Sequence, residues 1–276
     1  MQARLATAVA ATVSTIASAQ TAAIPPREIV RLAVETDRKS QAAARNYTFL
    51  MRQEQRQFDT AGRTQSRESR TWDYTLVEGS PFRRLVSRDD RPLAEKEQKL
   101  EEEKLRKSIE ERRRETPGER ERRIADWERS QEKRREPLRE IPDAFDFKLA
   151  GEEAINGVQV YVIDATPHPG YRPKSASAAF LPKVRARFWI AKNDYHWVKL
   201  DMETLDTVAL GAILVRLAKG SHLMVEQTKV NNEVWLLKAV DLRITARILL
   251  VKGLRREYLF TFSDYKKFQV TSRVVE

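Results

Sequence analysis

Three histidines, His168, His196 and His222, have the side chains best suited to metal binding or proton transfer near neutral pH. The first lies between two prolines, the second at the start of a predicted strand and the third just after a glycine turn. Such positions are typical of surface and turn histidines. A site built from all three would require the fold to gather ligands that are far apart in the sequence. We therefore predict no metal site.

The short motifs that organise catalysis or cofactor binding are absent from the sequence. It contains no G-x-S-x-G elbow, no G-x-G-x-x-G or P-loop to hold a phosphate, and no H-E-x-x-H pair. Cysteine is also absent, which excludes disulfides, Cys-ligated zinc and lipid attachment at a lipobox-type cysteine. The sequence therefore predicts a protein that is not an enzyme and that carries no cofactor.

Tryptophan is the remaining residue type from which a binding site could be built. Four of the five fall in predicted strands, where large aromatic side chains commonly fill the space between a sheet and a helix. The same side chains can line a groove that accepts acyl chains, and for any single tryptophan core packing is the simpler explanation. The five are Trp72, Trp127, Trp189, Trp197 and Trp235.

The charge of the chain is high but evenly distributed. Charged residues make up 33% of the sequence, and the net charge is +11. Residues 94–136 hold 15 Lys+Arg against 14 Asp+Glu, so this densely charged segment is nearly neutral. Nucleic-acid-binding proteins usually concentrate basic residues on one stripe with interleaved aromatics. We therefore predict a solvated basic surface and no nucleic-acid partner.

The first 19 residues have the three parts of a secretory signal peptide. Arg4 is followed by a small and apolar run, and Ala17-Ser18-Ala19 forms an A-x-A site before Gln20. A membrane-spanning helix needs roughly 20 strongly apolar residues, which this run does not supply. We predict cleavage near Gln20 and a periplasmic or secreted mature chain.

The mature chain is predicted to begin with a helix over residues 27–45. Pro25 and Pro26 precede it, and proline suits the first turn because the N–H it lacks would be unpaired there. Apolar residues then recur with a helical period. Three alternating segments follow, predicted as an antiparallel meander: residues 47–58, 63–77 and 81–88.

Residues 93–137 form a charged insertion with few apolar side chains. High helix propensity and many Glu-to-Lys/Arg pairs at i,i+4 predict helices, and Thr116-Pro117-Gly118 predicts a break between them. The apolar positions keep no heptad repeat, so a long coiled coil is not expected. We predict two exposed helices that form a hairpin. A charge run of this kind is usually a solvated face, and partner binding is the alternative.

Strand patterns return after Pro142. We expect a turn at residues 151–156, a long irregular loop over residues 167–182, and an apolar run at 208–217 that fits either a buried strand or a short helix. The predicted strands of this half are residues 145–150, 158–166, 185–191, 196–205, 222–230, 234–249 and 256–262. In residues 234–249, apolar side chains alternate with Asp241, Arg243 and Thr245, which indicates one wet face and one covered face.

Residues 187–268 resemble the periplasmic outer-membrane lipoprotein-sorting (LolA/LolB-like) superfamily. The matching pieces are Phe188-Trp189-Ile190, Asn193-Asp194, Val198 to Glu203, Lys219-Gly220-Ser221, Val230 to Leu236 and Phe262 to Phe268. The resemblance implies an α+β fold in which a curved antiparallel sheet, an incomplete barrel, packs around helices and receives lipid or acyl chains on its concave face. The implied groove residues are Trp189, Leu236, Val240, Leu242 and Ile244.

Two functions follow as hypotheses. The first is a non-catalytic periplasmic carrier that binds a lipid or an acylated protein in the apolar groove. The alternative is a cell-envelope interaction or sensor protein that binds an envelope protein through residues 93–137.

Overall fold

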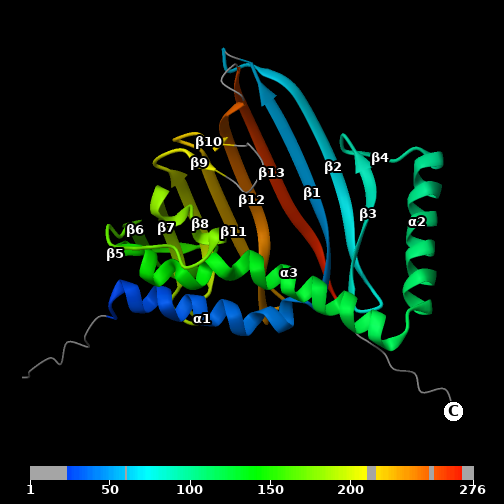
Figure 1. The fold of residues 1–276 in the computed structure, drawn as a ribbon, viewed down its shortest axis with the longest axis horizontal. Helices are drawn as coiled ribbons and strands as arrows, with labels where there is room; N and C mark the ends of the chain where they lie inside the picture. The colour runs from blue at the N-terminus through cyan, green and yellow to red at the C-terminus, as the bar shows by residue number, and fades with distance from the viewer. Residues whose placement is uncertain (1–23, 60, 210–215, 249–251, 269–276) are drawn as a thin grey trace, which may run out of the picture.

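The computed structural model describes residues 24–59, 61–209, 216–248 and 252–268. The predicted signal peptide, residues 1–19, lies outside these ranges. The described chain forms one large, curved antiparallel sheet that is not closed into a barrel, with helices on one side (Figure 1). The prediction of an α+β half-barrel with a charged helical insertion is confirmed.

The strands follow one another in space in the order β4-β3-β2-β1-β13-β12-β11-β8-β7-β6-β5, and β9 and β10 join beside β12. Their bounds are β1 Tyr47–Phe58, β2 Thr64–Val77, β3 Ser80–Arg88, β4 Arg91–Pro92, β5 Phe145–Ile155, β6 Val158–Pro167, β7 Val184–Ala191, β8 Trp197–Thr204, β9 Val208–Ala209, β10 Arg216–Leu217, β11 His222–Val230, β12 Val234–Ile248 and β13 Lys252–Lys267.

The predicted strands are found, with two differences. The turn expected at residues 151–156 is only Asn156 and Gly157, because β5 continues to Ile155. Strand β13 is longer than residues 256–262, because it pairs with β12 along one side and with β1 along the other. The loop of residues 168–183 contains two short 3-10 helices, Ala176–Ala178 and Leu181–Lys183.

Helix α1, Pro26–Ala44, buries its apolar stripe against the sheet. Ile29, Val30 and Ala33 have almost no exposed surface and belong to the main hydrophobic core. The core side chains of the sheet come from β5 to β8, and Phe145, Phe188 and Ile190 are among those fully buried. The core therefore fills the half of the concave side that faces these four strands.

The charged insertion forms helix α2, Glu95–Arg114, and helix α3, Pro117–Ala144. The break between them lies where the sequence predicts it. Thr116 caps α3 in a reciprocal capping box with Glu119, which satisfies backbone N–H groups that have no partner within the helix. Figure 1 shows α2 standing beside β3 while α3 runs beside α1 across the open side of the sheet. The prediction of two helices is therefore confirmed and α2 is exposed, but the two helices do not form a hairpin and the end of α3 is buried.

The C-terminal end of α3 is anchored in the core. Ile141 and Ala144 are buried there. Glu140 is buried as well, and its carboxylate accepts hydrogen bonds from the N–H of Lys174, at 2.8 Å, and from the hydroxyls of Tyr171 and Ser175. Burial by itself raises the pKa of Glu140, but these donors overcome that effect and hold it below its ordinary value. The carboxylate thereby fixes the loop that follows β6 to this helix.

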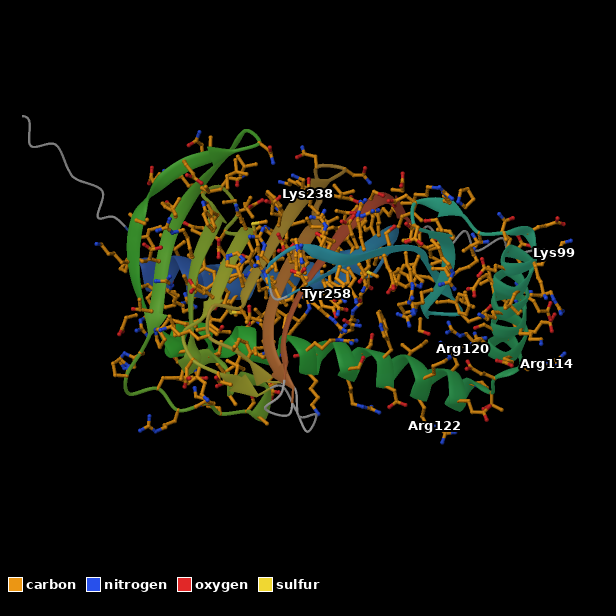
Figure 2. The ribbon with its side chains drawn as sticks, turned by 90° about the horizontal axis from the view of Figure 1, so that it is seen from above. Lys99, Arg114, Arg120, Arg122, Lys238 and Tyr258 are labelled. Carbon is orange, nitrogen blue, oxygen red and sulfur yellow. The ribbon has the colours of Figure 1, made fainter. Side chains whose placement is uncertain are left out.

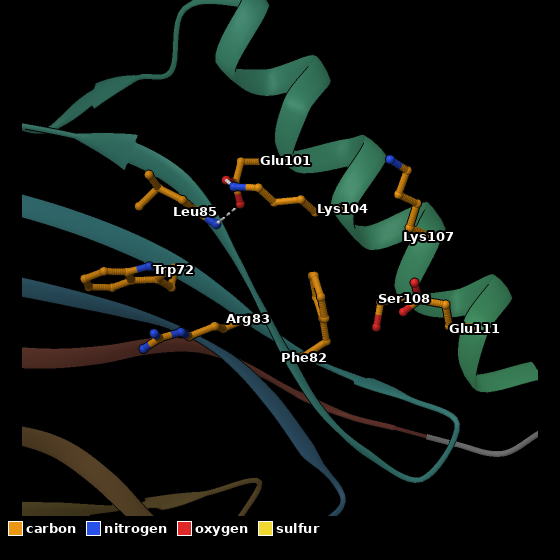
Figure 3. A pocket seen from close by; sticks show the side chains of 9 residues that line it. All are labelled: Trp72, Phe82, Arg83, Leu85, Glu101, Lys104, Lys107, Ser108 and Glu111. Carbon is orange, nitrogen blue, oxygen red and sulfur yellow. Dashed lines mark hydrogen bonds and ion pairs between the residues drawn. The ribbon is translucent and has the colours of Figure 1, made fainter. Parts of the chain in front are cut away.

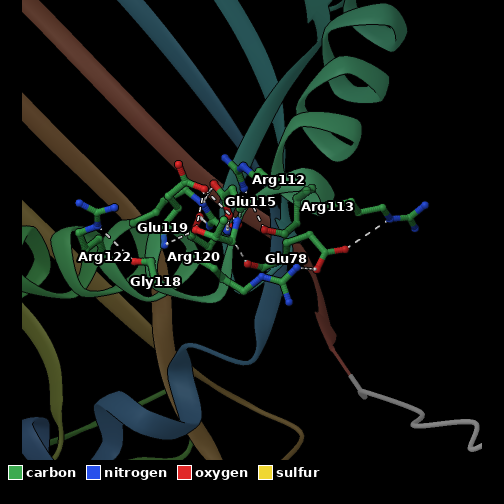
Figure 4. A network of polar contacts seen from close by, with 12 residues as sticks. Glu78, Arg112, Arg113, Glu115, Gly118, Glu119, Arg120 and Arg122 are labelled. Atoms are coloured by element: carbon green, nitrogen blue, oxygen red, sulfur yellow. Dashed lines mark hydrogen bonds and ion pairs between the residues drawn. The ribbon is translucent and has the colours of Figure 1, made fainter.

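The N-terminal end of α3 is anchored on the turn between β2 and β3 (Figure 4). Glu78 and Gly79 both have positive φ, of 44° and 86°, as a type I′ hairpin turn requires. Arg112 donates to the carbonyls of Val77 and Ser80 at 2.9 and 3.0 Å. Arg123 donates to the Glu78 carbonyl and to the Ser80 hydroxyl at 2.9 and 2.6 Å. The corner between α2 and α3 thus grips the end of a hairpin.

These two anchors lie near opposite edges of the sheet. Helix α3 has 28 residues, which corresponds to a length of about 42 Å at ~1.5 Å per residue. From β3 to β5 there are nine strand-to-strand steps, or about 43 Å along the curve of the sheet at roughly 4.8 Å each, so the straight distance between these strands is shorter than the helix. Figure 2 shows the sheet arching on one side with α3 along the other. The helix therefore spans the concave side from one edge of the sheet to the other.

The buried carboxylate of Glu54, in β1, binds arginine side chains of β1 and of the neighbouring strand β2. Glu54 is only 3% exposed and lies within 2.7–2.9 Å of the guanidinium groups of Arg52, Arg56 and Arg67. The hydrogen bond from Arg67 contributes most to lowering the pKa of Glu54, to about 2. The carboxylate is therefore ionised across the physiological pH range.

Replacing Gly79 tests the anchor at the hairpin turn. We expect Gly79→Ala to reduce the free energy of unfolding by about 1–2 kcal/mol, because an L-residue is strained at a φ of +86°. Gly118→Ala is the matched control, since no atom lies within 4 Å of the added Cβ and the position is helical. Urea unfolding of both variants gives the comparison. Equal effects of the two substitutions would contradict this account of the turn.

The cluster around Glu54 predicts a specific loss of stability in acid. Because the folded pKa is lowered from 4.5 to about 2, the contribution is complete above about pH 4.5 and is lost as the pH falls toward 2. We expect Glu54→Gln to lose on the order of 1–3 kcal/mol at neutral pH and to flatten this part of the stability profile. Glu68→Gln is the control, since the Glu68 side chain is 60% exposed. Parallel profiles for the wild type and Glu54→Gln would disprove the assignment.

Candidate functional site

A cavity of about 750 Å³ lies between the concave face of the sheet and the middle of α3. It begins where the hydrophobic core ends. Phe188, Trp197 and Ile141 belong to both, whereas the rest of the sheet wall comes from β1, β2, β3, β8, β11, β12 and β13. The cavity therefore occupies the half of the concave side that the core leaves unfilled.

Aromatic side chains form much of the sheet wall. Phe49 stacks on Tyr74 with ring centroids 4.9 Å apart, and it also contacts Phe262 at 5.7 Å and Tyr265 at 5.6 Å. These four rings come from three adjacent strands, β2, β1 and β13. Offset and tilted ring packing of this kind gives a rigid apolar surface.

Helix α3 forms the opposite wall with side chains one or two turns apart. The cavity-lining residues of this helix are Trp127, Gln131, Arg134, Arg135, Leu138 and Ile141. The two ends of this row are apolar and its middle is polar. Helix α1 contributes Asp37, whose carboxylate lies 2.6 Å from the Arg135 guanidinium and so joins the two helices across the cavity edge.

Two tyrosines place hydroxyl groups on the wall. The Tyr265 hydroxyl donates to the Leu237 carbonyl at 2.5 Å, and burial raises the pKa of Tyr265 above its ordinary value. Burial also raises the pKa of Tyr47, with a further increase from its hydrogen bond to Glu233. Both phenols therefore stay neutral, and neither is poised to act as a base near neutral pH.

A second cavity of about 590 Å³ lies between α2 and the strands β2 and β3 (Figure 3). Its lining is mixed and includes Trp72, Phe82 and Lys104. At its edge the Glu101 carboxylate accepts a hydrogen bond from the Leu85 N–H at 3.1 Å. Since β4 covers only two residues of β3, this contact satisfies a donor that the sheet leaves unpaired.

The groove residues proposed from the sequence are distributed over both sides of the sheet. Leu236 is buried and lines the 750 Å³ cavity. Val240 lies opposite Val225, which lies opposite Leu200, and the latter two line the cavity. Leu242 and Ile244 follow Val240 at alternate positions of β12 and are half-buried, so the same face continues beyond the cavity.

Trp189 lies elsewhere. It pairs with Val162 and Lys199 in the register and packs against a smaller cluster that contains Val160 and Trp235. Its indole N–H donates to Glu153. The tryptophans that line the 750 Å³ cavity are Trp127, Trp197 and Trp235. Sequence reasoning did not select any residue of α3 for the site. The available signal was the helical spacing of Ile124, Trp127, Leu138 and Ile141.

Each histidine has its own aspartate partner. His168 lies 2.9 Å from Asp146, His196 lies 3.4 Å from Asp194, and His222 lies 2.6 Å from Asp201. Within the described ranges, no group of three or more His, Asp or Glu side chains is close enough to hold a metal ion. Among the same residues, no helix is long and apolar enough to cross a membrane.

No family model and no curated protein matches the chain. Among solved structures, it is similar to a domain described as an outer membrane lipoprotein-sorting protein from Vibrio parahaemolyticus, with 10% identity, coverage of 90% of this chain and 95% of that one, and a TM-score of 0.36. It is also similar to a LolA superfamily protein from Nitrosomonas europaea, with 9% identity, coverage of 92% and 98%, and a TM-score of 0.31. These neighbours are of the class that residues 187–268 resemble.

Filling the cavity should abolish the uptake of a small apolar probe. We expect Val225→Trp to weaken binding of the neutral dye phenylnaphthylamine about tenfold, because the indole would project from β11 into the space that the dye needs. Lys238→Trp is the control, since this exposed side chain lies on the outside of the sheet (Figure 2). Dye fluorescence titration measures both. Unchanged affinity in Val225→Trp would place the dye site elsewhere.

Proposed function

We propose that this protein is a non-catalytic carrier that shelters the acyl chains of a lipid or of a lipid-modified protein. The observation that supports this proposal is the cavity between the sheet and α3. Its volume of about 750 Å³ lies within the range of roughly 300–1,000 Å³ that is common for small-molecule sites. Its walls are rich in aromatic and aliphatic side chains, and polar side chains of α3, of the sheet and of the α1 end lie among them.

The size of the cavity also argues for an occupant. Protein interiors are close-packed, and voids larger than a water molecule are few. Here α3 does not close onto the sheet, because the middle of the helix presents Gln131, Arg134 and Arg135 where apolar side chains would be needed to fill the gap. A flexible acyl chain is a suitable filling, since it adapts to an irregular apolar space and buries its own surface there.

The proposed location is outside the cytoplasm, in the periplasm or beyond the cell. This part of the proposal rests on the N-terminal sequence, whose basic start, apolar run and A-x-A site are the pattern of a secretory signal. A carrier of acyl chains has a clear task in that setting, because a lipid crossing water between two membranes needs its apolar part covered.

A second candidate function uses helix α2. This helix buries none of its residues, and side chains such as Lys99 and Arg114 project away from the sheet (Figure 2). An envelope protein could bind this charged face. Deleting residues 94–136 would not separate the two functions, because Trp127, Gln131, Arg134 and Arg135 would be lost from the cavity wall. Charge substitutions confined to the outer face of α2 separate the two functions better, because they leave the cavity wall unchanged.

The carrier hypothesis predicts co-purifying lipid. Protein isolated from its native compartment under mild conditions should release acyl-containing molecules on extraction, detectable by mass spectrometry. We expect Val225→Trp to lose most of this lipid and Lys238→Trp to keep it. Alanine substitutions of Lys99 and Arg114 should also leave the lipid in place.

The opposite pattern would favour the second candidate. Lipid-free protein that also ignores lipid vesicles, combined with a co-purifying protein that is lost when Lys99 and Arg114 are replaced, would contradict the carrier hypothesis. Equal lipid content in all four variants would mean that the lipid lies on the surface and not in the cavity.

A further inference from the structure

The cationic side chains around the 750 Å³ cavity are more numerous than the anionic ones. Five basic residues contribute to the lining, and Asp37 is its one acidic residue. Three of the five have acidic partners at 4.0 Å or less. Arg135 is paired with Asp37 and Arg45 with Glu128, each at 2.6 Å, and Lys199 lies 4.0 Å from Glu226.

The other two, Arg83 and Arg134, have no carboxylate within ion-pairing distance among the described residues. Arg134 donates to the Ser130 hydroxyl, at 3.2 Å, and to the side-chain oxygen of Gln131, at 2.9 Å, both uncharged acceptors. The Arg83 guanidinium lies over the Trp72 ring, 5.9 Å from its centroid. Arg134 projects from α3, and Arg83 from β3 on the opposite wall, where it lies opposite Tyr74 in the register. Two guanidinium groups without a carboxylate partner therefore contribute to the lining of the 750 Å³ cavity from two sides, and Arg83 also lines the 590 Å³ cavity.

Most arginines of the two helices that lack a carboxylate partner lie away from the cavity. Four arginines of α2 and α3 have no carboxylate partner among the described residues, and only one of the four, Arg134, lines this cavity. The other three are Arg112, which holds the hairpin turn, and Arg114 and Arg122, which point away from the sheet in Figure 2. Guanidinium groups bind phosphate and carboxylate oxygens in a planar, two-pronged geometry that ammonium groups do not provide.

Resting on the proposed carrier function, we propose that the ligand is an acyl lipid with an anionic headgroup, whose phosphate or carboxylate binds Arg83 and Arg134 while its chains enter the aromatic cavity. The apolar wall of Phe49, Tyr74 and Phe262 suits the chains. The net positive charge of the lining suits an anion and disfavours a cationic or uncharged headgroup. The ligand class is thus set by charge as well as by shape.

The test offers the full-length mature protein vesicles that contain equal amounts of phosphatidylglycerol and phosphatidylcholine with identical acyl chains, in salt of about 0.15 M. After the vesicles are removed, mass spectrometry measures the two lipids that the protein retains. We expect the wild type to retain about tenfold more phosphatidylglycerol than phosphatidylcholine. The double variant Arg83→Gln, Arg134→Gln should bring this ratio close to one, because the retention of phosphatidylglycerol falls toward that of phosphatidylcholine.

The double variant Arg114→Gln, Arg122→Gln is the matched control. It removes the same number of positive charges, two, from the same basic protein. It therefore measures how much of the ratio comes from non-specific attraction to the anionic vesicle surface. A wild-type ratio near one would overturn the anionic-headgroup proposal and leave the carrier function standing, and so would an equal fall of the ratio in the control. Retention of neither lipid by the wild type would instead contradict the carrier function itself. The wild-type ratio decides the question even where a variant fails to fold.

Discussion

Helix α3 is fixed at its two ends and free of core contacts in its middle, and the cavity exists because of this arrangement. At one end Ile141 and Ala144 enter the core and Glu140 is held by a loop. At the other end Arg123 and its neighbours hold the turn between β2 and β3. A helix is a stiff rod over this length, so two fixed ends are enough to hold its middle above the sheet without apolar packing there.

The charged composition of the insertion is consistent with this arrangement. Individual exposed ion pairs, such as those along α2, contribute little stability each. The polar contacts at the corner between α2 and α3 differ, because Arg112 and Arg123 donate directly to backbone carbonyls of a hairpin and are partly buried. Sequence composition does not distinguish the two cases, since both consist of arginine and glutamate. The insertion is therefore a structural part of the concave side, whatever partner its outer face has.

The strands and α1 could be predicted because their signals are local. Alternation in residues 47–58 and the proline-started apolar stripe of α1 each reflect burial on one side of a single element. The role of α3 could not be predicted in the same way, because Trp127 and Ile141 are separated by mainly polar residues and the partners of the helix lie far away in the sequence. Strand β5 beyond Ala150 was missed because an edge strand has one neighbour and needs little apolar character. The sequence therefore predicted the part of the candidate site that lies in β12, but not the wall that α3 forms.

The ends of α3 hold the helix in place while its middle lines the cavity, and this division affects which substitutions the protein tolerates during evolution. Substitutions at Gln131 or Arg134 alter what the cavity wall offers to a ligand but touch neither the core nor the hairpin turn. These positions and the two anchors of α3 are different residues, so substitutions in the middle of the helix can change the cavity wall without loss of either anchor.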